Sequence, residues 1–260
     1  DAHQSRMATR VRTIDLLRGL ETASKKLPGL FSYECWGSAT FDVAYRFLYE
    51  YPWERLRQMR KKAPNILLQM LIRGANAVGY TSYPDNVVKN FVELSAKNGI
   101  DVFRIFDSLN SLDNMYETVQ AVRETGKIAE VALCYTGDIL DASRPKYNLD
   151  YYVKMAKELQ NAGANIIAIK DMAALLKPRA AKELVGTLKK ELHVPLHLHT
   201  HDSTGNGVST VLMAAEAGVD IVDLAIESMS SMTSQPSMNA VVEALRGTKR
   251  DTGLDFEELS

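Results

Sequence analysis

Cysteine and long apolar runs are both scarce in this sequence. Its 260 residues include two cysteines, Cys35 and Cys134, each inside an apolar strand-like run and without a CxxC partner. This usage does not indicate a disulfide framework. No apolar run approaches the roughly 18 residues of a membrane span, and the polar start Asp-Ala-His-Gln does not resemble a signal peptide. The sequence therefore predicts a soluble domain that is neither secreted nor inserted in a membrane.

An excess of charge of either sign is also missing. Lys and Arg together number 31, Asp and Glu number 32, and the formal net charge is −1. Because the basic residues are dispersed along the chain, the pattern of a nucleic-acid-binding surface is absent from the sequence. A starting Met is absent too, so we expect the chain to be a fragment or a processed piece.

Short apolar runs with the composition of strands recur along the chain. Their starts lie 26 to 36 residues apart, which is the length of one β-α unit. The seven predicted strands are Leu30–Trp36, Ile66–Arg73, Val102–Asp107, Glu130–Thr136, Asn165–Asp171, Pro195–Asp202 and Ile221–Glu227.

Segments with helical periodicity lie between these runs, and several are followed by a glycine that fits the C-terminal cap position. The predicted helices are Asp85–Asn98, Ser111–Thr125, Leu149–Ala162, Pro178–Leu192 and Gly207–Ala217, and the capping glycines are Gly99, Gly126, Gly163 and Gly218. Strands that are apolar on both faces and alternate with helices imply a parallel sheet covered by helices.

Closure of this sheet into a TIM (β/α)8 barrel is the predicted fold. The first residues resemble the loop after a strand, so an eighth strand that ends at Asp1, largely truncated, completes the barrel count. A doubly wound open sheet is the alternative, but no Gly-rich phosphate-binding fingerprint follows the early strands. We expect the barrel to span residues 1–247, and residues 248–260 to begin a C-terminal helical extension that is cut off.

The strand Pro195–Asp202 holds three of the chain's five histidines at alternate positions, His197, His199 and His201. Alternate residues of a strand point to the same side, and imidazole is the commonest metal ligand. A buried strand whose histidines bond to their neighbours is the competing interpretation. We favour a metal site held by His199 and His201, nearest the carboxyl end of the strand, with His197 a layer deeper in the core.

Polar groups also stand at the other strand ends, where the chemistry of such barrels takes place. Two histidines and a carboxylate are a common ligand set for a catalytic divalent ion. Asp1 is the natural carboxylate, because the strands that end at Asp1, Lys170 and the histidines are close neighbours in a closed barrel. Lys170 cannot bind a cation unless it is deprotonated or carbamylated, so an ion-pair network with Asp171 is its alternative role.

Four further residues are candidates for ligand binding. Arg73 offers a forked donor for a small carboxylate, and Gln4 is placed to orient a keto oxygen. Tyr80 and Asp42 are candidates for a second ligand. Asp42 fits equally well in the first turn of a helix capped by Thr40.

Several motifs resemble the carboxyltransferase domain of the biotin-dependent carboxylases, and the resemblance covers essentially the whole chain. The shared motifs are Asp1-Ala-His-Gln-Ser5, Glu34-Cys-Trp-Gly37, Tyr51-Pro-Trp-Glu-Arg-Leu-Arg57, Gln69-Met-Leu-Ile-Arg-Gly-Ala-Asn76, Phe103-Arg-Ile-Phe-Asp107, Ile169-Lys-Asp-Met-Ala173 and His197-Leu-His-Thr-His201. The loops Cys134–Ile139, Arg144–Tyr147, Thr200–Gly207 and Thr233–Ser237 are similar to those of the pyruvate carboxylase branch.

The resemblance implies a site and its cofactors. A divalent ion, Mn²⁺ or Zn²⁺, would be held by Asp1, His199, His201 and a carbamylated Lys170. Arg73 and Gln4 match the pyruvate-contacting arginine and glutamine, and these two with Lys170 would be the catalytic residues. The residues that match the pocket for the biotin ring are Asp42 and Tyr80.

The implied reaction is the carboxyltransferase half-reaction of pyruvate carboxylase, a ligase of gluconeogenesis. Carboxybiotin, delivered on a biotin carboxyl carrier domain, would release carbon dioxide to the enolate of pyruvate and give oxaloacetate. ATP would be used by a separate biotin carboxylase domain of the parent chain. The resemblance also implies a homo-oligomer, a tetramer in the parent, without nucleic acid or membrane, in the bacterial cytoplasm or, in a eukaryote, the mitochondrial matrix.

Some features of the sequence depart from the family pattern. Ser5-Arg6-Met7 replaces an apolar pair, and the family's proton-shuttling threonine would lie beyond Ser260, so we expect residues 1–260 alone not to complete carboxyl transfer. Three other functions stay open: the α subunit of a transcarboxylase or oxaloacetate decarboxylase, a metal-dependent aldol-type lyase acting on an acyl-CoA, and a catalytically silent assembly module.

Overall fold

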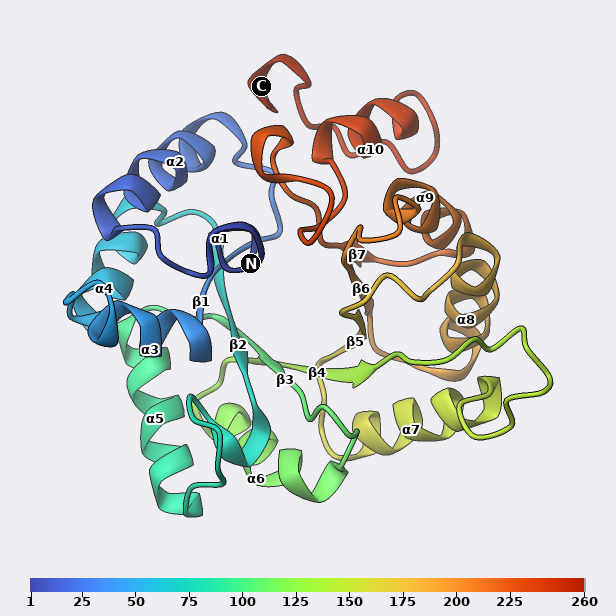
Figure 1. The fold of residues 1–260 in the computed structure, drawn as a ribbon, viewed down its shortest axis with the longest axis horizontal. Coiled ribbons are helices and arrows are strands. Elements are labelled where there is room, and N and C mark those ends of the chain that lie inside the picture. The colour runs from blue at the N-terminus through green and yellow to red at the C-terminus, as the bar shows by residue number, and fades with distance from the viewer. Residues whose placement is uncertain (260) are drawn as a thin grey trace. The chain divides into compact units, whose positions relative to one another are not determined.

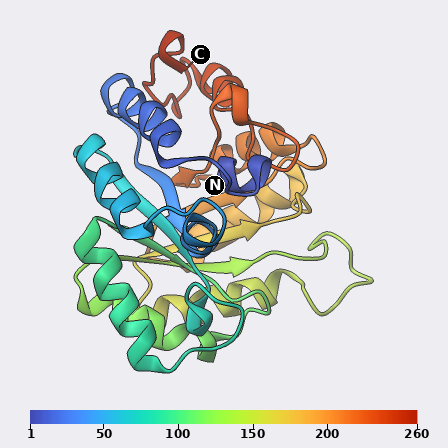
Figure 2. The ribbon, with the colours of Figure 1, turned by 60° about the vertical axis from the view of Figure 1, so that its left-hand side comes forward.

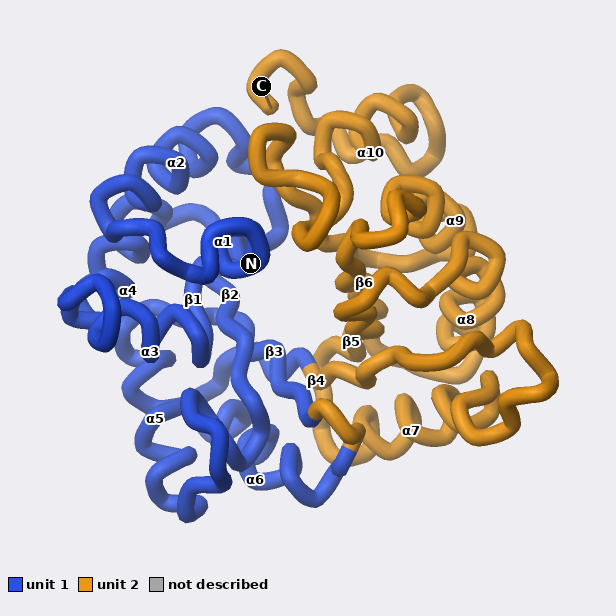
Figure 3. The backbone as a smooth tube through the Cα atoms, viewed as in Figure 1, with its two compact units in different colours: residues 1–107, 111–130 blue, residues 108–110, 131–260 orange. Residues whose placement is uncertain are grey.

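The computed structural model describes residues 1–259, which form two compact units (Figure 3). Unit 1 consists of Asp1–Asp107 and Ser111–Glu130. Unit 2 consists of Ser108–Asn110 and the residues from Val131 onward. The boundary falls within one strand, so each unit contains its own stretch of parallel strands and the helices that pack on them.

Unit 1 begins with two helices and then alternates strands with helices (Figure 1). Its helices are α1 (Ala2–Met7), α2 (Thr13–Lys26), α3 (Ser38–Arg46), α4 (Pro52–Lys62), α5 (Asp85–Asn98) and α6 (Leu112–Glu124), with the 3₁₀ turn η1 (Gly74–Asn76). Its strands are β1 (Ser32–Gly37), β2 (Leu67–Ile72), β3 (Val102–Ile105) and the start of β4 (Ile128–Cys134).

Unit 2 continues the alternation from the end of β4. Its strands are β5 (Ile166–Asp171), β6 (Leu196–Thr200) and β7 (Ile221–Val222). Its helices are α7 (Leu149–Asn161), α8 (Pro178–Glu191), α9 (Gly207–Ala217) and α10 (Met238–Leu245), with the 3₁₀ turns η2 (Glu227–Met229) and η3 (Glu257–Leu259).

All seven predicted strands are present, and they pair in parallel in chain order within each unit. In unit 1, β2 pairs with β1 and with β3. In unit 2, β6 pairs with β5 and with β7. The register of β5 with β6 places Lys170 opposite His199, which brings two of the predicted site residues next to each other.

The five predicted helices are also present, and the bounds of α5 and α9 match the prediction. Helix α8 shows why the periodicity was informative: Pro178 occupies its first turn, and Ala180, Leu184 and Leu188 recur on one buried face. Two of the four predicted capping glycines, Gly99 and Gly218, are C-cap residues, with positive φ angles of 125° and 101°. Gly126 and Gly163 each follow the C-cap residue, Thr125 or Ala162, and also have positive φ angles.

The loop after β4, residues 136–148, extends away from the strands of unit 2 (Figure 2). Its base is held by tyrosines. The hydroxyl of Tyr152 donates to the Thr136 carbonyl and accepts from the Thr136 amide, both at 2.8 Å, and the rings of Tyr135 and Tyr152 stack with centroids 5.1 Å apart. The loop therefore leaves the strands from a rigid aromatic support.

Other predictions concern single features of the chain. Cys35 and Cys134 are both buried. Among the described residues, no helix is long and apolar enough to cross a membrane. The boundary expected between residues 247 and 248 stays a prediction.

Buried charge in unit 1 is concentrated around Arg104 of β3. Its Nη1 donates to Glu34 Oε2 of β1 at 2.7 Å, and its Nε donates to Glu130 Oε1 of β4. The Gln69 amide, in the orientation that satisfies its neighbours, donates to Ser32 Oγ and accepts from Arg104 Nη2, both at 2.8 Å. The side chains of Arg104 and Glu130 have no exposed surface. One guanidinium thus links its own strand, β3, to three other strands, β1, β2 and β4.

Asp101 of unit 1 joins three partners at the amino ends of β2 and β3. Its carboxylate accepts from Arg60 Nη1 at 2.5 Å, from Lys127 Nζ at 2.9 Å and from the Leu68 amide at 3.1 Å. Burial by itself would raise the pKa of Asp101, but the bonds from Lys127 and Leu68 and the charges of Lys127 and Arg60 lower it below its usual value.

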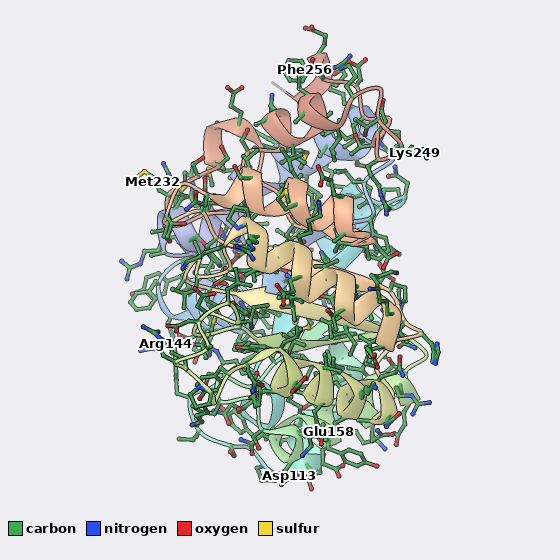
Figure 4. All side chains as sticks on the ribbon, turned by 90° about the vertical axis from the view of Figure 1, so that its right-hand side faces the viewer. Asp113, Arg144, Glu158, Met232, Lys249 and Phe256 are labelled. Atoms are coloured by element: carbon green, nitrogen blue, oxygen red, sulfur yellow. The ribbon has the colours of Figure 1, made fainter. Side chains whose placement is uncertain are left out.

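We expect Asp101→Asn to lower the free energy of unfolding by about 2 kcal/mol at neutral pH, since it removes charge-assisted hydrogen bonds. The unfolded carboxyl has a pKa of about 3.9. Because the folded pKa is lower, the stabilisation is complete above the unfolded pKa and is lost as the pH falls through the folded pKa. Urea unfolding should therefore show a smaller stability difference between the parent and Asp101→Asn at acid pH than at neutral pH. The control Asp113→Asn, on the exposed surface (Figure 4), should change the free energy of unfolding little at either pH.

Candidate functional site

The histidines of β6 are buried in unit 2. His197 and His199 are 0% and 2% exposed, and His201 follows directly after the strand. The Nε2 atoms of His199 and His201 lie 3.3 Å apart. The structure thus brings together the two histidines that the sequence favoured as metal ligands, and places His197 in the core.

The partners of the two rings assign their tautomers. His201 Nδ1 lies 2.6 Å from the Thr233 carbonyl oxygen, which can only accept, so this nitrogen carries a hydrogen. His199 Nδ1 lies 2.6 Å from Asp223 Oδ2, and an ionised carboxylate also only accepts. In a neutral ring with its hydrogen on Nδ1, the Nε2 atom carries a lone pair that can bind a cation.

The Nε2 atoms lie 3.3 Å apart, close enough for one divalent cation to be bound by both. Metal-bound histidines typically donate their other ring nitrogen to a carboxylate or a carbonyl, as these two rings do to Asp223 and Thr233. Burial lowers the pKa of His201, and the charge of Lys170 acts in the same direction, so the neutral imidazole is favoured. The donor set fits a metal ion.

Lys170 occupies the position opposite His199 on the neighbouring strand β5 and is 4% exposed. Asp171, its proposed ion-pair partner in the alternative interpretation, accepts hydrogen bonds from the amides of Leu175 and Leu176 at 3.0 and 2.8 Å and from Thr200 Oγ1 at 3.1 Å. Successive strand residues point to opposite faces. Asp171 thus orders the loop after β5, and Lys170 faces the side of His199.

Asp223 was missed by the reasoning from sequence. It follows β7 directly, and its two oxygens bind two histidines: Oδ1 lies 2.8 Å from His197 Nε2 and Oδ2 lies 2.6 Å from His199 Nδ1. The predicted strand Ile221–Glu227 placed Asp223 inside the strand, whereas β7 ends at Val222, so its position at a strand end was not recognised.

In unit 1, Arg73 follows β2 and contacts Tyr80. Its Nη1 donates to the Gly79 carbonyl at 3.1 Å, and its guanidinium carbon lies 4.9 Å from the centroid of the Tyr80 ring. Tyr80 is 73% exposed. Two residues predicted to serve different ligands are therefore in contact with each other.

The remaining predicted residues of unit 1 lie on helices. Gln4 is half-buried on α1, whose N-cap residue is Asp1. The main-chain oxygen of Asp1 accepts from the main-chain amide of Gln4 at 2.8 Å. The expected cap of α3 was wrong: the helix begins at Ser38 directly after β1, Gly37 is its N-cap, and Thr40 lies inside it. Asp42 pairs with Arg46 one turn later at 3.1 Å.

The polar strand end Arg104–Asp107 has partners in unit 1. Arg104 belongs to the buried ion network of unit 1. Asp107 accepts from the Ser111 amide at 3.0 Å and from Asn114 Nδ2 at 3.2 Å, and so fixes the start of α6. Both side chains have structural partners in their own unit.

A strained turn holds the carbonyl that binds His201. Ser231 and Met232 both have left-handed backbones, with φ angles of 64° and 53°, and Thr233 follows them. The turn is fixed by hydrogen bonds from the Ser231 amide to the Gln235 carbonyl at 2.8 Å and from the Asp202 amide to the Ser234 carbonyl at 2.9 Å. A left-handed backbone is strained in non-glycine residues, and such strained residues are often found at functional sites.

Met232→Gly should therefore raise the free energy of unfolding by about 0.5–1 kcal/mol, because glycine adopts a positive φ without strain. Little packing is lost, since Met232 (Figure 4) is 66% exposed. Thermal unfolding compared with Met172→Gly provides the control: Met172 is 44% exposed in another loop of unit 2 and has no positive φ angle. A decrease in stability for both variants would contradict the strain.

Comparisons with known proteins give a consistent result. The chain is 59% identical over 250 residues to the pyruvate carboxylase of Bacillus subtilis, covering 96% of this chain and 22% of that protein. It is 55% identical over 260 residues to the mitochondrial pyruvate carboxylase of Homo sapiens, covering 100% of this chain and 22% of that protein. The chain thus spans about a fifth of the length of these relatives.

Solved structures agree with the sequence relatives. The carboxyl transferase domain of Rhizobium etli pyruvate carboxylase with pyruvate matches with a TM-score of 0.98 and 57% identity, covering 100% of this chain and 44% of that one. The same domain with oxamate and biotin matches with the same TM-score, identity and coverage. This likeness confirms the predicted fold class, an α/β TIM barrel, and the resemblance seen in the sequence. Since the model of the HMGL-like family matches residues 87–260, the chain belongs to the HMGL-like family.

Proposed function

We propose that this chain forms the carboxyltransferase centre of a pyruvate carboxylase, where carbon dioxide passes from carboxybiotin to the enolate of pyruvate and oxaloacetate forms. One observation carries the proposal. The Nε2 lone pairs of His199 and His201 converge at 3.3 Å on the side of β6 that Lys170 faces from β5. The identity of 55–59% to the pyruvate carboxylases named above supports the same reaction.

The proposed metal ligands are His199, His201, Asp1 and a carbamylated Lys170. A carbamate would convert a buried ammonium into an anion that can bind the cation, and Lys170 is 4% exposed, in surroundings that disfavour an isolated charge. Asp1 is proposed from the family motif Asp1-Ala-His-Gln-Ser5. When bound, the ion, Mn²⁺ or Zn²⁺, would act as a Lewis acid towards the enolate oxygen.

Pyruvate would be bound by Arg73 and Gln4. The guanidinium of Arg73 offers two parallel donors to the substrate carboxylate, and one edge is fixed by its bond to the Gly79 carbonyl. Gln4 would donate its amide to the keto oxygen. The methyl proton would pass to the biotin ring nitrogen that loses carbon dioxide, and the carbon of the resulting enolate would attack the carbon dioxide. The preorganised charge of Arg73 would stabilise the negative charge that develops on the enolate.

The biotin ring would be received beside Tyr80 and Asp42. The support comes from the contact between the Tyr80 ring and Arg73, which links the proposed biotin and pyruvate residues within unit 1. The Rhizobium etli domain has been solved with oxamate and biotin and with pyruvate and biocytin. We propose the same two ligands for this chain.

The wider assembly is also a proposal. The biotin would be attached to a carrier domain and carboxylated by an ATP-dependent biotin carboxylase domain. The parent enzyme would be a homo-oligomer, namely a tetramer. The complete Rhizobium etli enzyme is described as multifunctional, which supports this organisation. We propose the bacterial cytoplasm as its location, or the mitochondrial matrix in a eukaryote, since the relatives include bacterial and mitochondrial pyruvate carboxylases.

The test is an assay of the full-length protein for oxaloacetate formed from pyruvate, bicarbonate and ATP. Oxaloacetate that requires pyruvate, and that disappears when avidin sequesters biotin, is the expected result. Biotin-independent cleavage of an acyl-CoA would instead identify an aldol-type lyase. Carboxyl transfer without ATP would identify a transcarboxylase or decarboxylase subunit, and protein with none of these activities and no bound metal would be a silent assembly module.

A further inference from the structure

Asp223 bonds to two histidines that differ in their relation to the proposed metal. His199 is a proposed ligand, whereas His197 is fully buried in the core of unit 2. The two carboxylate oxygens divide between them, Oδ1 to His197 Nε2 at 2.8 Å and Oδ2 to His199 Nδ1 at 2.6 Å. The Asp223 amide also donates to the Leu198 carbonyl of β6 at 2.9 Å. Asp223 is therefore held against β6 at three points.

We propose that Asp223 is the positioning residue of the metal site: it fixes the tautomer and the orientation of His199. This inference rests on the proposed function, because it assumes a divalent ion at His199 and His201. A neutral imidazole has two tautomers, and only the one with its hydrogen on Nδ1 presents a lone pair at Nε2. A carboxylate at Nδ1 selects that tautomer and increases the basicity of the ligating nitrogen.

His197 explains why the carboxylate can perform this role. A carboxylate held at one oxygen can rotate about its Cβ–Cγ bond and release its partner. The bond from His197 Nε2 to Oδ1 restrains that rotation and keeps Oδ2 directed at His199. The third histidine of the motif, which does not ligate in the proposed site, then acts on the ion through Asp223.

His201 is supported by a different kind of group. Its Nδ1 donates to the main-chain carbonyl of Thr233, which no side-chain substitution removes. A variant of Asp223 therefore changes the support of one ligand and leaves the support of the other in place. This asymmetry makes the contribution of Asp223 measurable on its own.

The experiment measures Co²⁺ affinity and the visible spectrum of bound Co²⁺ in the full-length protein after removal of its native metal. We expect Asp223→Ala to weaken Co²⁺ binding about 10- to 100-fold and to shift the visible bands, as loss of such a partner does in metal sites generally. Asp223→Ser serves as a second variant that keeps a polar atom at this partly exposed position, and the same loss is expected. Circular dichroism and thermal unfolding of the metal-free proteins report whether each variant folds.

Asp220→Ala is the matched control. Asp220 lies three residues earlier, and its carboxylate accepts from Lys189 Nζ at 2.7 Å and from the Leu196 amide at 2.8 Å, away from the histidines. This variant should lose stability but keep the Co²⁺ affinity and spectrum of the parent. If the role of Asp223 is purely structural, Asp223→Ala and Asp223→Ser should behave like Asp220→Ala, with lower stability but with the Co²⁺ affinity and spectrum of the parent.

The outcomes separate this inference from the proposed function. Parent-like Co²⁺ affinity and spectrum in folded Asp223→Ala or Asp223→Ser protein would overturn the positioning role while leaving the metal site in place. If the parent binds Co²⁺ no better than His199→Ala does, the metal site itself fails, and with it the proposed function and this inference. Weakened binding in both Asp223 variants but not in Asp220→Ala supports the proposal.

Discussion

Replacing Lys170 with alanine should lower the rate of pyruvate-dependent oxaloacetate formation in the full-length protein by about a hundred- to a thousandfold. Loss of a single preorganised charge or donor at such a centre costs about 10²–10³ in rate. Lys170 faces His199 from the neighbouring strand and is 4% exposed. The loss should appear in the rate of turnover and in metal content together.

Lys170→Arg separates the two roles considered for this residue. Arginine keeps the positive charge but cannot form the carbamate, and its pKa keeps it protonated. If Lys170 acts as a carbamate, Lys170→Arg should be as inactive as Lys170→Ala. If it acts as a cation in an ion-pair network, Lys170→Arg should retain much of the activity, and the proposed ligand set would be wrong.

Lys177→Ala controls for the loss of a lysine from the same segment. The side chain of Lys177 is 64% exposed, and its Nζ pairs with Asp138 at 2.6 Å in the loops that follow β5 and β4. Exposed ion pairs contribute little, so this variant should keep the activity of the parent. Metal affinity that increases with bicarbonate in the parent, but not in Lys170→Arg, gives a second readout that does not depend on catalysis.

The elements that the sequence predicted are those with a regular pattern and enough length. Helices α5 and α9 were predicted residue for residue, because their apolar spacing is clear and Gly99 and Gly218 end them. Helices α1, α2, α4 and α10 were not predicted, and for α3 only a start capped by Thr40 was considered. Six residues in α1 are too few to establish a period, and α4 contains six charged residues among eleven, so its apolar face is narrow.

In the site too, the features set by neighbouring residues were predicted, and those set by residues far along the chain were not. Alternation within one strand was sufficient to select His199 and His201, because both lie on the same face. Their protonation depends on Asp223 and Thr233, which lie 24 and 32 residues away along the chain. Strand β7, which places Asp223, has two residues, and so short an element carries little signal of its own.

Arg104 shows the same limit in unit 1. It belongs to the predicted strand Val102–Asp107. Its partners Glu34 and Glu130 lie 70 and 26 residues away, and the spacing of charges in the sequence does not indicate that three strands bring them together. A buried charge with distant partners is therefore recognisable only when the pairing of the strands is known.

Arg104→Met should lower the free energy of unfolding of unit 1 by about 3–5 kcal/mol, the loss expected when one member of a buried ion network is removed. Methionine fills a similar volume, so the effect comes from charge and not from a cavity. The side chain of Glu130 has no exposed surface and that of Glu34 is 13% exposed, so both carboxylates would remain in the interior without the guanidinium.

Chemical denaturation followed by tryptophan fluorescence measures the loss of stability in unit 1. The two tryptophans of the chain, Trp36 and Trp53, both belong to unit 1. Arg104→Lys should be destabilised as well, because an ammonium cannot reproduce the fork that binds Glu34, Glu130 and Gln69. Lys89→Met is the control: it removes an exposed cation of unit 1 paired with Glu124 and should leave the unfolding transition almost unchanged.

The triple variant Arg104→Met, Glu34→Gln, Glu130→Gln decides between two explanations of such a loss. If the cost arises from carboxylates left in the interior without their cation, neutralising both should recover a large part of it, because an uncharged polar group costs less to bury than a charge. If it arises from poor packing of methionine, the triple variant should be no more stable than the single one. Arg104→Met protein whose unfolding midpoint and slope equal those of the parent would show that the network does not hold these strands together.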